Sequence, residues 1–205
     1  MTKILLTRHG HVEGIAPERF RGRQQLALTE RGRAEVQALA RRIAGGWKPQ
    51  HIYTSPLQRC VDTGTAIART CGIAAGKPRS DLNDIDYGDW QGLTRDEAHA
   101  RWPAEIDLWY AHPDWAALPN GESLQQVLTR AVAALRDIVR RHPDDTVVLV
   151  AHDSVNRVLL LHALELPLSR YWRLKQSPCC INELDFGPDG FTIHSINRTG
   201  HLPPG

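Results

Sequence analysis

The sequence is poor in the residues and patterns that mark several specialised protein classes. Its 205 residues include four cysteines and one methionine, and only 6% of the residues are aromatic. The formal net charge is +2, so no excess of one sign favours binding to nucleic acid. No apolar stretch approaches the length of about 20 residues that a membrane-spanning helix needs. We therefore expect neither nucleic acid nor a membrane as a partner.

The four cysteines lack the spacing of a disulfide framework or of a CxxC metal site. Cys60 and Cys71 fall inside one predicted helix, and Cys179 and Cys180 are adjacent. We therefore expect reduced, structural cysteines and no metal ion. The N-terminal apolar run is too short for the core of a signal peptide and has no small-residue cleavage site, so we expect a cytoplasmic protein.

The rest of the composition is that of an ordinary globular protein. Hydrophobic residues make up 41% of the sequence and charged residues 23%. A chain of 205 residues is long enough to bury a stable core and short enough for one domain. We expect a single domain over residues 1–205.

Short apolar runs rich in β-branched residues predict parallel strands. Residues 3–7 ("KILLT") and 146–152 ("TVVLVAH") have this composition, and residues 51–55 ("HIYTS") predict a third, shorter strand. Towards the C-terminus, "CINELDF" and "FTIHSI" flank "GPDG", which is typical of a β-hairpin.

Helical patterns lie between these strands. Thr29 is a suitable N-cap for a helix that ends at Gly45, and Ser55 followed by proline predicts the start of a second helix. A third helix, from about Glu122, has apolar residues at helical spacing and ends before Pro143. Strands that alternate with helices predict an α/β fold, a three-layer sandwich whose mostly parallel central sheet has helices on both faces.

Residues 94–119 do not follow this alternation. The segment is rich in tryptophan and histidine, prolines interrupt it, and no single apolar face is apparent. We expect a helical or loop excursion beside the sheet. Its tryptophans Trp102, Trp109 and Trp115 either line one side of a binding site or pack the segment as a lid.

Charged and titratable residues follow the predicted parallel strands at the points where the strands end. Arg8, His9 and Gly10 come directly after the first strand, His152 ends another, and Arg59 lies in the first turn of the helix after the third. The carboxyl ends of parallel strands share one edge of a sheet, where ligands gather. Two arginines and two histidines buried together are costly without an anion, so a phosphate or carboxylate is the expected occupant.

Six motifs occur in the order and spacing of a known family. They are "LLTRHG", "PERFRGR…LTERGR", "IYTSPLQRCVDTG", "LNDIDYGDWQGLT", "PNGESLQQV" and "VVLVAHDSVNRVLL". Together they resemble the histidine phosphatase superfamily, in its phosphoglycerate-mutase-like branch. The resemblance runs from about residue 2 to residue 186.

The resemblance implies a role for each residue at the predicted sheet edge. His9 would be the nucleophile, with one ring nitrogen attacking phosphorus while the other donates its proton to the backbone carbonyl of Gly10. The product would be a phosphohistidine. Arg8, Arg59 and His152 would hold the phosphoryl oxygens, and no metal or other cofactor would be required.

The resemblance also implies a carboxylic acid that protonates the leaving group and later takes a proton from water. The family usually has glutamate at this position, and here "LND" supplies Asp84. Aspartate can do the same chemistry if its loop comes about one methylene closer. Asp86, two residues further on, is the alternative.

Other positions depart from the family pattern. Where relatives often have serine or glutamine before the glycine of "RFRG", this sequence has Arg21, which either contacts the anion or faces solvent. The threonine and asparagine that relatives place after the first histidine are missing, and His11 stands where many have an acid. A Gly-Gly pair common after the second histidine is replaced by Asp153 and Ser154; aspartate there is suited to cap the following helix.

Three functions are consistent with these features. The first is a metal-independent phosphomonoester hydrolase that acts through a phosphohistidine on a small phosphorylated metabolite. The second is a phosphoglycerate mutase, which uses the same intermediate but protects it from water, and the third is a non-catalytic phosphate-binding module. In each case the expected partner is a small phosphate ester. The sequence does not indicate an oligomeric state or a particular substrate.

Overall fold

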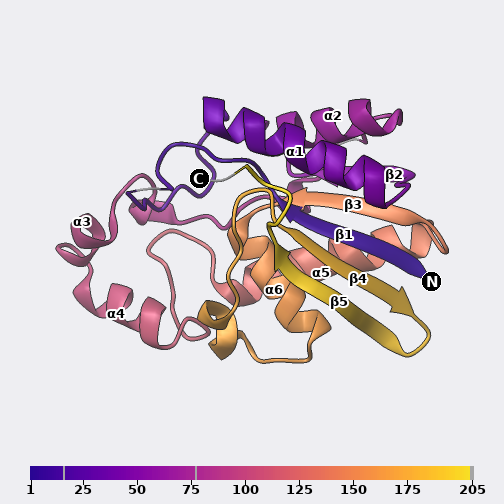
Figure 1. Ribbon diagram of the computed structural model, residues 1–205. Coiled ribbons are helices and arrows are strands. Elements are labelled where there is room, and N and C mark those ends of the chain that lie inside the picture. Colours follow the sequence, from indigo (N-terminus) through magenta and orange to yellow (C-terminus); the bar gives the residue numbers. More distant parts are fainter. Residues whose placement is uncertain (16, 77, 204–205) are drawn as a thin grey trace.

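Five strands form a mixed sheet at the centre of the computed structural model, which describes residues 1–15, 17–76 and 78–203 (Figure 1). The sheet order is β2-β3-β1-β4-β5. β1 pairs with β3 in parallel, as does β2, whereas β4 is antiparallel to β1 and to β5. The strands are β1 (Thr2–Arg8), β2 (His51–Thr54), β3 (Thr146–Ala151), β4 (Ile181–Gly187) and β5 (Gly190–Arg198). The predicted parallel strands and the C-terminal hairpin are confirmed.

Helices cover both faces of this sheet, as predicted (Figure 1). Alternate side chains of β1 point to opposite faces, so Ile4 and Leu6 pack in one core cluster and Leu5 in another. The helices on the Leu5 face are α1 (Glu30–Gly46) and α2 (Gln58–Cys71), and those on the other face are α5 (Leu124–Arg141) and α6 (Asp153–Ala163). The three-layer α/β sandwich is therefore confirmed.

The helix starts follow from local hydrogen bonding. Thr29 caps α1, since its side chain accepts a hydrogen bond from the amide of Gly32, as expected. α5 begins at Leu124, about two residues later than predicted, because Ser123 is its cap. α2 also begins later than expected, at Gln58, because the Ser55 side chain accepts from the Leu57 amide and forms a turn first.

Short helices make up the irregular part of the chain beside the sheet. The predicted excursion contains α3 (Arg95–His99) and α4 (Pro103–Ala111), and the 3₁₀ turns are η1 (Ser80–Leu82), η2 (Gly88–Trp90) and η3 (Leu168–Arg173). Trp109 is fully buried and packs edge-on against Trp90 and Trp172, whereas Trp115 is 73% exposed. Trp109 therefore anchors the excursion to the core. No helix in the described ranges is both long and apolar enough to cross a membrane.

Candidate active site

The predicted cluster lies at the carboxyl edge of the parallel strands. Arg8 is the last residue of β1, His9 follows it, Arg59 lies in the first turn of α2, and His152 follows β3. All four side chains are buried, and Arg59 and His152 have no exposed surface. The His9 and His152 rings lie 5.2 Å apart between centroids. The structure thus brings together four residues that are up to 144 positions apart in the chain.

The two ring nitrogens of His9 have different surroundings. Nδ1 lies 2.7 Å from the carbonyl oxygen of Gly10, which can only accept, so this nitrogen carries the proton. Nε2 therefore has a free lone pair, and it accepts a hydrogen bond from Arg59 Nε at 3.2 Å. Burial, followed by the charges of Arg59 and His152, lowers the pKa of His9 well below its usual range. The imidazole is neutral at physiological pH, with Nε2 directed towards the cluster.

Gly10 is required here by close packing. A Cβ at this position would lie 2.7 Å from Val36 Cγ2 and 2.8 Å from the carbonyl oxygen of Gly32, both in α1. The loop after β1 therefore lies directly against the first turns of α1. The capping residue Thr29 holds the same loop, because its amide donates to the His11 carbonyl. His11 itself turns towards Thr29 Oγ1, at 3.0 Å, and none of the hydrogen bonds found among the described residues joins it to the cluster.

Backbone carbonyls fix both arginines. Arg59 donates through Nη1 to the carbonyl of Gln24 and through Nη2 to that of Gly22, both at 2.7 Å. Arg8 donates through Nη1 to the carbonyl of Gln176 at 2.6 Å. Its Nε is buried and has no hydrogen-bond partner among the described residues. A buried cationic donor of this kind is suited to an anionic ligand.

His152 completes the cationic and imidazole side of the site. Its Nδ1 lies 3.5 Å from Asp84 Oδ2, and the thiol of Cys60 lies 3.4 Å from its Nε2. Burial, followed by the charges of Arg59 and Arg8, lowers the pKa of His152 well below its usual range. The ring is therefore neutral at physiological pH and can donate only one hydrogen bond.

The two candidate carboxylates lie in different environments. Asp84 is 8% exposed, and its Oδ2 lies 3.2 Å from Arg59 Nη2, beside the cluster. Its Oδ1 accepts from the hydroxyl of Ser154 at 2.6 Å. Asp86 instead pairs with Arg23 at 3.3 Å and accepts from the Gly88 amide. Of the two candidate carboxylates, Asp84 is therefore the one that contacts Arg59 and His152.

Arg21 faces a cavity that adjoins the cluster. The cavity also has Asp84, Tyr87, Tyr110, Asp153 and Trp172 in its lining. Arg21 Nη1 donates to the carbonyl of Gly14, which keeps its side chain partly buried. Burial and the charge of Arg8 lower the pKa of Arg21, as expected for two guanidinium groups that face one site. The Arg21 side chain therefore lines this cavity and is only partly exposed to solvent.

Several residues that hold the side chains of this site in place could not be identified from the sequence. Asp153 is the first residue of α6 rather than its cap, and its Oδ1 accepts from Arg157 one turn later at 3.1 Å. It also lies 3.9 Å from Arg8, so it partly balances the buried charge. Ser154 orients Asp84 through its hydrogen bond to Oδ1. In the sequence, only the position of Ser154 directly after Asp153 could have indicated this role. The hydrogen bond from Arg8 to the Gln176 carbonyl could not be predicted from the sequence, because any residue can supply a backbone acceptor.

The sequence matches the model of one protein family over most of its length. Residues 4–199 match the histidine phosphatase superfamily (branch 1). Phosphoserine phosphatase 1 of Hydrogenobacter thermophilus is 30% identical over 205 residues, which cover 98% of this chain and 95% of that protein. A 2,3-bisphosphoglycerate-dependent phosphoglycerate mutase of Brucella anthropi is 35% identical over 164 residues, or 77% of this chain and 79% of that one.

A solved structure has the same fold. Bacillus stearothermophilus YhfR superposes on this chain with a TM-score of 0.91 at 28% identity, and the match covers 99% of this chain and 100% of that one. The agreement includes nearly all of the elements that position the cluster.

Proposed function

This chain belongs to the histidine phosphatase superfamily and is a phosphomonoester hydrolase of that type, and we propose that it hydrolyses small phosphorylated metabolites through a phosphohistidine on His9. The observation that carries this proposal is the fixed tautomer of His9. Its Nδ1 proton is held by the Gly10 carbonyl, while Nε2 faces Arg59 among buried cationic groups.

In the first step, His9 Nε2 attacks phosphorus and the ester P–O bond breaks. The Nε2 lone pair forms the new P–N bond, and the electrons of the broken bond leave on the alcohol oxygen. Because Gly10 accepts the Nδ1 proton as a hydrogen bond, it also stabilises the positive charge that develops on the ring. Water then attacks the phosphohistidine, which releases inorganic phosphate and restores His9.

The charge of the transferring phosphoryl group would be balanced by the residues around His9. Arg59 Nε lies 3.2 Å from the attacking nitrogen, so an oxygen of the phosphoryl group can replace that nitrogen as its acceptor. The unpartnered Nε of Arg8 supplies a second donor. Positive charge fixed in a buried site is effective here because it needs little reorganisation during the reaction.

Asp84 would move the two protons that the reaction requires. Its Oδ2 lies beside Arg59 and His152, while Ser154 holds Oδ1. As a carboxylic acid, Asp84 would protonate the leaving alcohol, and as a carboxylate it would later take a proton from the attacking water. The same residue can serve both steps because the leaving alcohol and the attacking water occupy the same side of phosphorus.

The direct test is a screen of phosphorylated metabolites, in the presence of a chelator, with His9→Ala and His11→Ala compared side by side. We expect phosphate release by the wild type, loss of at least about 10³-fold in His9→Ala, and activity within about tenfold of wild type in His11→Ala. A radiolabelled phosphoenzyme that is labile in acid should form only when His9 is present. An active His9→Ala variant would show that the nucleophile lies elsewhere.

The mutase is the second candidate, because one relative of similar identity bears that name. It would transfer the phosphoryl group of the same phosphohistidine to a second hydroxyl instead of to water. Product analysis with a phosphoglycerate separates the two functions. Release of inorganic phosphate supports the hydrolase, and interconversion of phosphoglycerates with negligible release supports the mutase.

Arg21 supports a substrate that carries a second anionic group. Its guanidinium lines the cavity next to the cluster and lies close enough to Arg8 for their charges to interact. A carboxylated phosphomonoester, such as phosphoserine or 3-phosphoglycerate, would place its carboxylate in this cavity.

Replacement of Arg21 tests the substrate class. We expect Arg21→Gln to raise KM about tenfold or more for carboxylated phosphate esters, and to change KM little for p-nitrophenyl phosphate, which has no carboxylate. Arg41→Gln removes the same charge from an exposed position on α1 and serves as the matched control. Equal effects of Arg21→Gln on both substrates would indicate that the residue binds only the phosphoryl group or supports the loop.

A further inference from the structure

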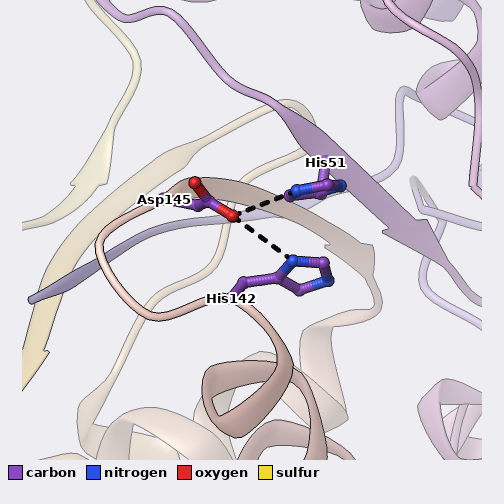
Figure 2. A group of neighbouring side chains, drawn as sticks. All are labelled: His51, His142 and Asp145. Carbon is purple, nitrogen blue, oxygen red and sulfur yellow. Dashed lines mark hydrogen bonds and ion pairs between the residues drawn. The ribbon is translucent and has the colours of Figure 1, made fainter.

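Two histidines and an aspartate meet at the opposite edge of the sheet from the phosphate site (Figure 2). His51 is the first residue of β2, His142 follows the end of α5, and Asp145 lies directly before β3. None of these residues takes part in the proposed hydrolysis. The length of β3, six residues or about 20 Å, separates them from His152.

The potential ligand atoms of the three side chains lie close together. Asp145 Oδ2 lies 3.1 Å from His51 Nε2 and 3.5 Å from His142 Nδ1. All three donor atoms lie within 4.8 Å of one another. Ligands bound to zinc at about 2.0–2.1 Å in a tetrahedral arrangement are about 3.4 Å apart, so the two contacts to Asp145 already have nearly the required spacing.

Tyr53 can give His142 the protonation pattern of a metal ligand. Its hydroxyl oxygen lies 2.7 Å from His142 Nε2 and can accept a hydrogen bond from it. In that tautomer Nδ1, which lies 3.5 Å from Asp145 Oδ2, keeps its lone pair. Histidines that bind metals commonly donate their second ring nitrogen to a fixed acceptor in this way, which sets both the tautomer and the orientation of the ring.

We propose that His51, His142 and Asp145 form a binding site for a divalent transition-metal ion such as Zn²⁺. Two imidazoles and one carboxylate suit zinc, nickel or copper, whereas magnesium and calcium prefer sites made entirely of oxygen ligands. Three protein ligands leave a fourth position for water. The side chains of His51 and Asp145 are 39% and 32% exposed, so solvent can reach the ion.

The bound ion would join elements that are distant in sequence. It would connect the start of β2, the end of α5 and the turn before β3, across a separation of 94 residues between His51 and Asp145. In the unfolded chain the three ligands are far apart, so the ion would bind only the folded protein. Its binding would therefore stabilise the fold. This role does not depend on the proposed hydrolysis and involves none of its residues.

A metal-free hydrogen-bonded triad would use the same three residues. In that arrangement one proton of each histidine points at Asp145, and no ligand is needed. The two arrangements differ in their response to substitution, because asparagine and glutamine preserve hydrogen bonding but are poor ligands for zinc.

The experiment is calorimetric titration of Zn²⁺ into chelator-treated protein, together with the absorption spectrum of Co²⁺ as a probe of coordination. We expect one ion per chain, a rise in Tm of about 5–10 °C at one hundred times Kd, and an unchanged rate of phosphate-ester hydrolysis. Asp145→Asn and His142→Gln should each weaken Zn²⁺ binding by more than about 100-fold, and Tyr53→Phe by about tenfold.

His194→Gln is the matched control. His194 pairs with Asp185 at 2.8 Å, but these two belong to no group of three potential ligands among the described residues. This control should bind Zn²⁺ like the wild type. The proposal is overturned if wild-type protein binds no Zn²⁺, if Asp145→Asn and His142→Gln retain full affinity, or if His194→Gln loses as much affinity as they do.

Discussion

At the scale of single residues, the proposed chemistry depends on which atom of each side chain faces the His9 cluster. His9 presents Nε2 because Gly10 holds the Nδ1 proton, and its lowered pKa keeps the ring neutral. Asp84 presents Oδ2 because Ser154 and the Ile85 amide occupy Oδ1. In the proposed reaction the hydroxyl of Ser154 would therefore act as a positioning group for the Asp84 carboxyl.

Asp84→Asn tests the assignment of the acid. The amide cannot donate a carboxylic proton, so kcat for an alkyl phosphate should fall about 10²–10⁴-fold. The loss should be much smaller for p-nitrophenyl phosphate, whose leaving group needs no proton. Asp86→Asn should stay within about threefold of wild type, since Asp86 pairs with Arg23 and Gly88. An inactive Asp86→Asn beside an active Asp84→Asn would reverse the assignment.

At the scale of secondary-structure elements, the loop after β1 is set by its contact with α1. Gly10 lies against Val36 and Gly32 without room for a Cβ, and Thr29 caps α1 while its amide bonds the His11 carbonyl. The position of His9 is therefore coupled to the N-terminal end of α1. We therefore expect a change in either element to move His9 relative to Arg59.

Gly10→Ala should displace this loop. A Cβ at 2.7–2.8 Å from its neighbours forces a shift of the backbone, and a shift of about 1 Å in an active site can cost about 10²-fold in rate. We expect kcat to fall by roughly this factor and the protein to lose stability. Gly45→Ala, in the last turn of α1 with nothing within 4 Å of the added carbon, should stabilise the fold by about 0.5–1 kcal/mol. Unchanged kinetics in Gly10→Ala would show that the loop adapts without cost.

At the scale of the whole molecule, two core clusters enclose a polar edge. The sheet separates the clusters, and the two buried histidines, His9 and His152, lie where its parallel strands end. Both have a pKa well below the usual range because they are buried beside arginines. Folding therefore keeps two histidines neutral that would accept protons in the unfolded chain near pH 6.

The molecule should lose stability as the pH falls below about 6.5. Between the lowered pKa of these histidines in the folded protein and their usual pKa, the unfolded chain binds more protons than the native one. The folded state is therefore stabilised above this pH range and loses that stabilisation as the pH falls through it. Each histidine contributes at most about 1.4 kcal/mol per pH unit. Urea unfolding at pH 7.5 and 5.5 should show a shallower dependence in the His9→Gln/His152→Gln double variant. Equal slopes would mean that other groups control acid stability.

The features that depend on local pattern were predictable from the sequence. Apolar runs predicted the strands, Thr29 predicted a helix cap, and the motifs at the strand ends indicated one shared edge, because strand formation and capping depend on neighbouring residues. The tertiary structure decided which of Asp84 and Asp86 lies beside Arg59, and that Arg21 turns towards the site.

The cluster of His51, His142 and Asp145 could not be predicted from the sequence. Its members are separated by up to 94 residues and follow no ligand spacing, so no window of the sequence reveals them. The parallel pairing of β2 with β3 brings them together. The sequence by itself determined the elements and the family, whereas contacts between distant side chains depended on the path of the chain through the sheet.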